Sequence, residues 1–150
     1  MEIINTLNIN EARKQIQKLK KENKEVIVRA QEPEFNRKIL EIKDVNVLLS
    51  REIHNRKDKL KQRDSGLNEV LCKLAAKNNI KIGINIEEIK KLEKKQKAIV
   101  LARIMQNIML CKRTKTQIVF IPALKKQEAL SFMQSLGAST QQAVFSYNKK

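Results

Sequence analysis

The sequence is poor in the residues that build most enzyme active sites. Its 150 residues include one histidine, three glycines, two prolines, two cysteines and no tryptophan. A single histidine, His54, excludes a histidine-rich metal site, and it lies in an irregular basic segment without the partner residues that histidine-assisted catalysis requires. We therefore expect His54 to be a solvated side chain rather than a catalytic one.

Other common site motifs are missing as well. The three glycines, Gly66, Gly83 and Gly137, stand apart, so the sequence has neither a GxGxxG nor a GxxxxGK phosphate-binding loop. The acidic residues Glu87 and Glu88 could contribute to a Mg²⁺ site, but they lie at a predicted helix start, where carboxylates interact favourably with the helix dipole. The sequence thus predicts no catalytic residue and no cofactor or metal bound by the protein itself.

The cysteines and the apolar segments indicate an intracellular protein. Cys72 and Cys111 lie on apolar faces of predicted helices, and we expect two buried free thiols in a reducing compartment. No run of about 18 apolar residues occurs, and the first residues lack the basic and apolar regions of a secretory signal. The expected location is the cytoplasm, with no membrane contact.

Acidic residues are half as numerous as basic ones. The chain has 32 Lys and Arg against 16 Asp and Glu, a net charge of +16. Residues 1–50 carry 10 basic and 8 acidic groups (net +2), residues 51–115 carry 18 and 7 (net +11), and the remainder carries 4 and 1 (net +3). Such a basic middle third, which includes the run RKDKLKQR at 56–63, attracts polyanions.

Aromatic residues are scarce where the charge is concentrated. None of the four Phe and one Tyr lies between residues 36 and 119. Proteins that bind single strands usually stack bases on aromatic rings, so the pattern favours phosphate contacts to a folded RNA, which His54 could also touch. The alternative is that the charge runs are only solvated faces, and for KKLEKKQK at 90–97 the two interpretations are equally supported.

Segments with strand and helix patterns alternate along the chain. Strands are predicted at 2–5, 24–30, 45–50, 80–85 and 117–123. Helices are predicted at about 10–22, 34–42, 67–79, 86–113 with a break among the lysines at 90–97, 125–137, and from 139 or 140 onward. This alternation predicts a single α/β domain over residues 1–150 with parallel strands, and about five β/α units are too few for a closed eight-stranded barrel.

The stretch RDSGLNEVLCKLAAKNN at 63–79 contains the clearest helix. Apolar residues recur at the spacing of one helix face, namely at Leu67, Val70, Leu71, Leu74 and Ala75. Ser65 and Gly66 precede this helix, while Asn78 and Asn79 suit its end. In the long helix further on, the best apolar stripe is Leu101, Ile104, Met105 and Ile108.

Three stretches resemble one known family. They are NRKILEIKDVNVLLS at 36–50, RDSGLNEVLCKLAAKNNIKIGI at 63–84 and LARIMQNIMLCKRTK at 101–115. In these motifs the sequence is similar to archaeal ribonuclease P protein component 3, the family of the 30-kDa protein subunit of ribonuclease P. The resemblance covers residues 36 to about 123 well and the C-terminal part loosely.

The resemblance implies a fold and a role. The implied fold is TIM-barrel-like, and the implied role is that of a protein subunit in a ribonucleoprotein that removes 5′ leaders from precursor tRNA. In that family the ribonuclease P RNA performs Mg²⁺-dependent cleavage, and the protein, itself non-catalytic, works with a small partner subunit of ferredoxin-like or RNA-recognition-like fold. Family members have further β/α units at the N-terminus. We therefore expect an incomplete barrel that lacks about a quarter to a third of the full one. The strand edge that this exposes would be covered by the partner subunit or by a second copy of the chain.

The expected RNA-binding residues are all basic. The family motifs and the charge pattern together give Arg37, Arg56, Lys57, Lys59, Lys61, Arg63, Arg103, Lys112 and Arg113. Polar residues of the same motifs are assigned to turns and caps first, namely Asn36, Asp64, Ser65, Asn68, Asn79 and Asn107. The alternative function is a stand-alone RNA-binding or ribosome-assembly protein with an α/β fold.

Overall fold

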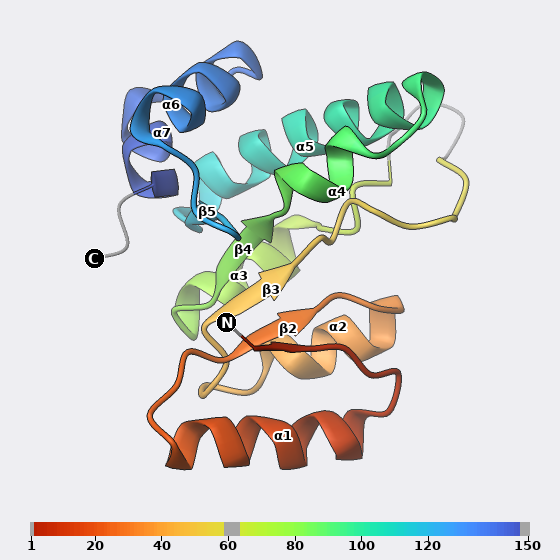
Figure 1. Ribbon diagram of the computed structural model, residues 1–150, viewed down its shortest axis with the longest axis vertical. Coiled ribbons are helices and arrows are strands. Elements are labelled where there is room, and N and C mark those ends of the chain that lie inside the picture. Colours follow the sequence, from red (N-terminus) through yellow and green to blue (C-terminus); the bar gives the residue numbers. More distant parts are fainter. Residues whose placement is uncertain (1, 59–63, 148–150) are drawn as a thin grey trace.

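The computed structural model describes residues 2–58 and 64–147. Within them, five short strands form one parallel sheet whose spatial order, β1-β2-β3-β4-β5, is also their order in the sequence (Figure 1). The strands are β1 (Ile3–Ile4), β2 (Ile27–Arg29), β3 (Val47–Leu49), β4 (Lys81–Ile84) and β5 (Ile118–Phe120). Each lies inside a predicted range, so all five strand predictions are confirmed.

Helices connect and follow the strands. They are α1 (Ile9–Lys21), α2 (Pro33–Leu40), α3 (Glu69–Lys77), α4 (Ile86–Lys90), α5 (Lys94–Thr114), α6 (Lys126–Ser135) and α7 (Thr140–Tyr147). The expected break among the lysines is confirmed, because α4 ends at Lys90 and α5 begins at Lys94. Asparagines start three of these helices: Asn8, Asn68 and Asn85 each accept a hydrogen bond from a first-turn backbone N–H of α1, α3 and α4.

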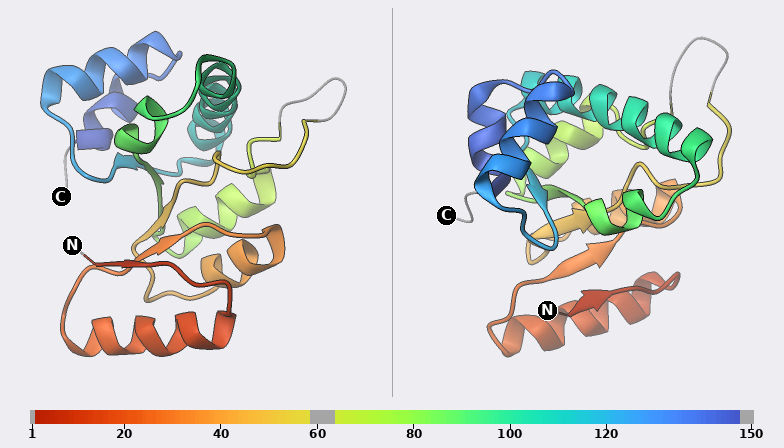
Figure 2. Two further views of the ribbon diagram at one scale, coloured as in Figure 1. Left: turned by 45° about the vertical axis from the view of Figure 1, so that its right-hand side comes forward. Right: turned by 45° about the horizontal axis from the view of Figure 1, so that its top comes forward.

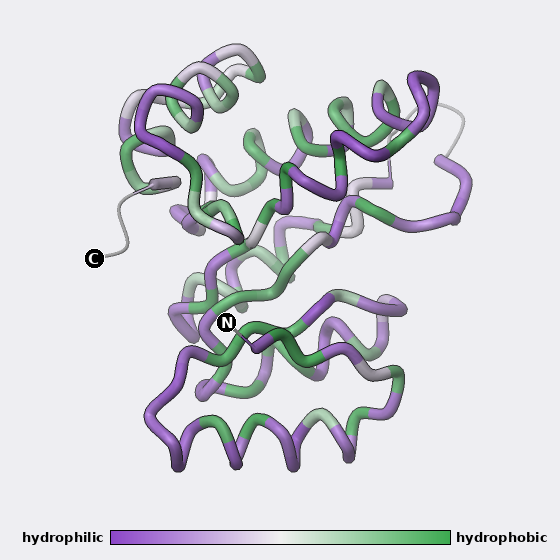
Figure 3. Tube along the Cα trace, in the orientation of Figure 1, coloured by the Kyte–Doolittle hydropathy of each residue, from purple (hydrophilic) through white to green (hydrophobic). Residues whose placement is uncertain are grey.

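The two faces of the sheet are built differently. One set of alternating strand residues, including Val28, Leu48 and Ile82, belongs to a large core cluster with residues from all seven described helices. The other set forms a smaller buried cluster of Ile27, Val47, Leu49, Val119 and Ile121. Figure 3 shows that the strands are largely apolar and that apolar and polar residues alternate along α1. Helices on only one face are the arrangement of a barrel, not of a doubly wound sheet.

Gly83 allows the strands to pack on the face of the sheet that carries the smaller cluster, with Val47 and Leu49. A Cβ at this position would lie 2.7 Å from Val47 Cγ1 and 2.9 Å from Leu49 Cδ1, so a side chain there would collide with the neighbouring strand. Among the described residues, β1 and β5 are the two edges of the sheet and do not pair with each other. The views in Figure 2 show the strands as an open array with α1 at one end and α6 and α7 at the other. The prediction of an incomplete, TIM-barrel-like α/β fold is confirmed.

The predicted apolar faces of two helices need correction. In α3, Val70 is 71% exposed, whereas Cys72 and Ala75 are fully buried. In α5, Met105 is 47% exposed, while the buried stripe instead includes Arg103 and Asn107. The burial of Cys72 and Ala75 agrees with the predicted face of α3, so the error there is Val70 alone. In α5 the stripe was located from apolar residues, whereas the polar residues Arg103 and Asn107 also occupy the buried side.

The structure agrees with the prediction of two buried free thiols. Both Cys72 and Cys111 are free and buried, on α3 and α5. No helix in the described part of the chain combines the length and the apolar composition needed to cross a lipid bilayer.

Candidate RNA-binding surface

The loop that leaves β3 is the centre of the basic region. It runs from Ser50 toward Asp58 at the carboxyl end of β3, the end where sites of barrel proteins gather. Its first residues, Arg51 and Glu52, are buried with exposed fractions of 3% and 0%. A buried basic loop needs internal partners, and α5 provides them.

Arg103 of α5 holds this loop. Its Nη1 donates to the carbonyl oxygens of Glu52 (3.0 Å) and His54 (3.2 Å), and its Nη2 donates to that of Arg56 (3.1 Å). Its Nε donates to the Asp58 carboxylate at 3.2 Å. The side chain is only 4% exposed. The structure therefore places Arg103, expected at the RNA-binding surface, inside the protein, where it fixes three carbonyl groups of the loop.

His54 is also held inside. Its Nε2 donates to the Asp64 carbonyl at 2.7 Å, and its Nδ1 accepts from the Arg56 N–H at 3.2 Å. The ring is 9% exposed, and burial lowers the pKa of His54, so the neutral ring suits both bonds. The expectation that His54 is solvated is wrong, because its ring links the loop to the turn at Asp64.

The turn before α3 is built by side-chain bonds. The Asp64 carboxylate accepts from the Gly66 N–H (3.1 Å) and from Arg56 Nε (3.2 Å), and Asn68 Oδ1 accepts from the Leu71 N–H at 2.8 Å. Burial alone would raise the pKa of Asp64, but the bonds from Arg56 and Gly66 outweigh it and lower that pKa. Asp64 and Asn68 thus have the turn and cap roles expected of them.

The remaining polar motif residues also serve local structure. Asn36 binds both the N–H and the carbonyl of Gln31, at 2.6 and 2.8 Å. Ser65 Oγ accepts from the Leu67 N–H at 3.4 Å, and Asn79 takes a positive φ of 56° after α3. Asn107 reaches the Ser65 carbonyl at 3.5 Å from within α5. The assignment to turns and caps is confirmed for Asn36, Ser65 and Asn79, while Asn107 joins a helix to a turn.

A second charged group at this end of the sheet was not predicted. Arg29, the last residue of β2, forms a two-bond ion pair with Glu88 of α4, one bond of which, from Nη2 to Oε2, measures 2.8 Å. Glu88 lies in the first turn of α4, as predicted, and also accepts from Asn85 Nδ2 at 3.2 Å. Close by, neither carboxylate oxygen of Glu52 has a hydrogen-bond partner among the described residues. Burial, with a contribution from Glu88, raises the pKa of Glu52 to about 7.

The exposed candidates fall into separate groups. Lys57 is exposed in the loop after β3 and Arg56 beside it is 31% exposed, whereas Arg37 lies on α2, 70% exposed and 3.7 Å from Glu41. Lys112 and Arg113 are exposed in the last turn of α5, nine or ten residues from Arg103. At 1.5 Å per residue this is roughly 14 Å along the helix. The expected Lys59, Lys61 and Arg63 lie outside the described residues.

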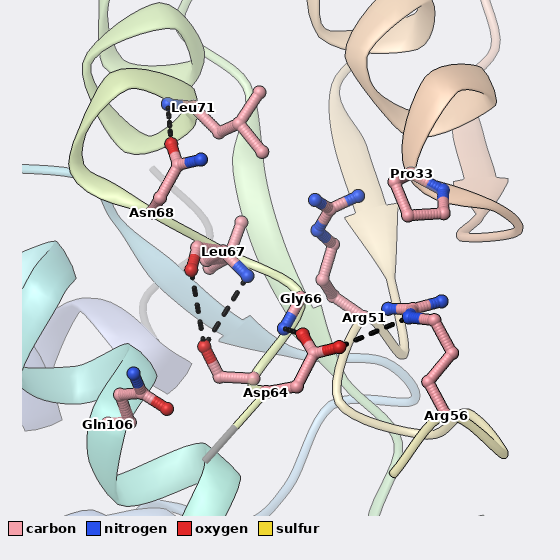
Figure 4. A pocket seen from close by; sticks show the side chains of 10 residues that line it. Pro33, Arg51, Arg56, Asp64, Gly66, Leu67, Asn68, Leu71 and Gln106 are labelled. Atoms are coloured by element: carbon pink, nitrogen blue, oxygen red, sulfur yellow. Dashed lines mark hydrogen bonds and ion pairs between the residues drawn. The ribbon is translucent and has the colours of Figure 1, made fainter. Parts of the chain in front are cut away.

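Sequence reasoning missed Arg51. This residue points from the end of β3 into a cavity of about 270 Å³ beside the N-terminus of α3 (Figure 4). The available signal was its position: it is the first charged residue after the buried segment VNVLLS, and the residue that follows a strand of a barrel often lies in a site.

These features define an α/β protein with an open, barrel-type parallel sheet and a basic loop at the carboxyl end of its strands. Comparison with known proteins agrees with the motifs in the sequence. Ribonuclease P protein component 3 of Methanococcus vannielii is 30% identical over 112 residues, which are 75% of this chain and 46% of that protein. The protein of the same name from Methanococcus maripaludis strain C5 is 28% identical over 116 residues, 77% of this chain and 47% of its own. The chain is therefore related to ribonuclease P protein component 3.

A solved structure supports the fold. A chain in the cryo-EM structure of archaeal ribonuclease P with mature tRNA superposes with a TM-score of 0.72 at 20% identity, covering 91% of this chain and 59% of that one. No family model matches the sequence. The chain spans about half the length of the curated relatives it matches.

Proposed function

We propose that this protein is a cytoplasmic subunit of ribonuclease P, the ribonucleoprotein that removes 5′ leaders from precursor tRNA. The observation that carries the proposal is the 30% identity to component 3 of Methanococcus vannielii across 75% of this chain. The net charge of +11 in residues 51–115 supports it, because Lys and Arg side chains attract the negatively charged phosphates of RNA.

The RNA-binding residues of this proposal are the exposed basic ones. They are Arg37, Arg56, Lys57, Lys112 and Arg113, together with Lys59, Lys61 and Arg63 from the sequence. Arg103 acts behind this surface by fixing the loop that carries Arg56 and Lys57. Such contacts go to phosphates and recognise the shape of a folded RNA rather than its bases.

In the proposed complex the RNA performs the chemistry. Mg²⁺ belongs to the ribonuclease P RNA, and the protein supports cleavage without a catalytic residue of its own. Within residues 2–58 and 64–147, no three His, Cys, Asp or Glu side chains lie together as a metal site would require. The small ferredoxin-like subunit would cover an open edge of the sheet, at β1 or β5, and a second copy of the chain is the other candidate for that edge.

The first test is binding of the cognate ribonuclease P RNA over a range of salt concentrations. If about ten phosphates are engaged, the log–log slope of affinity against salt should be roughly −7 to −9. A slope near zero would contradict RNA binding. A control RNA of equal length and unrelated fold separates the two functions: equal affinity for both RNAs would favour the stand-alone binder.

A further inference from the structure

The cavity beside α3 has an unusual lining. Its volume is about 270 Å³, and it is bordered by the start of α2, the first residues after β3 and the turn that leads into α3. In Figure 4 the Arg51 guanidinium stands between Leu71 of α3 and Pro33 of α2. A water molecule occupies about 30 Å³ of liquid, so the cavity has room for several waters or one tetrahedral anion.

Arg51 enters this cavity without a partner. Its side chain belongs to a residue that is 3% exposed, and its Nε and Nη1 have no hydrogen-bond acceptor among the described residues. Burial of an unpaired guanidinium is costly, since the charge loses its water without gaining an acceptor. Buried arginines are normally matched by a carboxylate or a phosphate.

The one acidic residue in the cavity lining is already engaged. Asp64 lines the same cavity, but its carboxylate binds Arg56 Nε and the Gly66 N–H. The cavity lining therefore contains two arginines and one aspartate, which leaves one positive charge. Burial and the neighbouring Arg56 lower the pKa of Arg51 to about 10, as expected for a cation that lacks a counter-charge.

The backbone around Arg51 leaves space for an anion. Gly66 has a φ of +79°, and a Cβ there would lie 2.8 Å from the Arg51 carbonyl oxygen and 3.4 Å from its Nε. Glycine thus keeps the flank of the guanidinium open. The N-terminus of α3, a helix of nine residues, borders the same cavity, and although the Leu71 N–H is taken by Asn68, the helix dipole favours negative charge there.

We propose that this cavity is a phosphate-binding site in which Arg51 is the principal ligand and the N-terminus of α3 contributes its dipole. The phosphate comes either from the RNA backbone or from free phosphate in solution. The RNA source rests on the proposed function, whereas the site itself does not.

The first arm of the test uses inorganic phosphate and the full chain without RNA. At constant ionic strength set with chloride, the melting temperature should rise by about 3–6 °C when phosphate is tenfold above its Kd. Arg51→Met keeps the unbranched stem and removes the guanidinium, so it should fold and lose this rise. Arg13→Met, at an exposed arginine of α1, should keep it.

Two results would overturn the proposal. They are an equal rise in Arg51→Met and wild type, or no rise beyond that given by chloride. If that variant is unfolded, Arg56→Gln gives an independent check, because Arg56 is half-buried in the same lining and its loss should weaken the phosphate response.

The second arm identifies the source of the phosphate. If the RNA backbone supplies it, Arg51→Met should weaken binding of the ribonuclease P RNA by roughly tenfold or more, the loss expected for one charge-assisted contact. Unchanged RNA affinity together with a lost phosphate response would assign the site to free phosphate. A wild-type chain that responds to phosphate but does not bind the RNA would refute the proposed function and leave the phosphate site standing.

Discussion

Arg103 connects the sequence motif LARIMQN to the shape of the basic loop. Its guanidinium makes bonds to three carbonyl groups and one carboxylate, all in residues 52–58. Its burial can be understood afterwards from helix spacing, because Val100, Ile104 and Asn107 on the same side of α5 are also buried. From the sequence, Arg103 was expected to contact RNA because it is the basic residue of a motif that resembles the family.

Arg103→Ala should therefore destabilise the fold. Removing Arg103 from this buried network leaves the loop carbonyl groups without this donor and takes one of its donors from the Asp58 carboxylate, at a cost of about 2–4 kcal/mol in the free energy of unfolding. Chemical denaturation measures the difference, and Arg113→Ala, at an exposed site on the same helix, should stay within about 0.5 kcal/mol of wild type. An Arg103→Ala chain with wild-type stability and weakened RNA binding would show that Arg103 is a direct contact.

Glu52 should make stability depend on pH. Its pKa is raised from the ordinary 4.5 to about 7 because it is buried, so between these values the folded chain holds a proton that the unfolded chain has released. The stability from this proton is fully present below pH 4.5 and is lost as the pH rises through about 7.

Glu52→Gln removes this titration. Between pH 4.5 and a pH above 7, wild type should lose about 1–3 kcal/mol of unfolding free energy relative to Glu52→Gln, because only wild type has the titrating carboxyl group. Denaturation at a series of pH values measures it, with Glu25→Gln as an exposed control. A pH-independent difference would mean that Glu52 is already ionised in the folded protein.

At the scale of elements, periodicity and caps located every described strand and helix. They worked because strand runs such as IKIGIN and caps such as Asn68 act locally, within a few residues. The orientation of a helix about its own axis was less predictable. In α3, Cys72 and Ala75 face the core as expected, but Val70, expected on the same face, points away from it.

The orientation of α3 gives a paired prediction. Val70→Glu should change the free energy of unfolding by less than about 0.5 kcal/mol, since Val70 is 71% exposed. Ala75→Leu should cost about 1–3 kcal/mol by overpacking, since Ala75 is fully buried. Thermal or chemical denaturation of both variants tests this. Because the face predicted from the sequence includes both residues, a Val70→Glu chain destabilised as strongly as Ala75→Leu would support that face.

The candidate site was less predictable than the fold. Lys57, Lys112 and Arg113 are exposed as expected, but Arg51, Glu52 and His54 are buried by contacts with segments up to about fifty residues away. Local sequence patterns contain no information about such contacts. The positive charge of the middle third could be predicted from the sequence. Which of its basic residues are exposed and which are buried in the fold could not.

At the scale of the whole molecule, shape and charge suit a subunit of a larger particle. The sheet is open at β1 and β5, and the helices all cover one face. The chain matches just under half of the length of its component 3 relatives, yet its described core is continuous across all five strands. The described residues thus combine one continuous core with two unpaired sheet edges.

Reconstituted cleavage of precursor tRNA tests the central claim most directly. The cognate ribonuclease P RNA and the small partner subunit are assayed with and without this chain over a range of Mg²⁺ concentrations. Adding the chain should raise the cleavage rate and lower the Mg²⁺ concentration needed for half-maximal activity, while the chain without RNA should not cleave. An unchanged rate and an unchanged Mg²⁺ requirement would contradict the account, and cleavage by the chain alone would contradict its assignment as a non-catalytic subunit.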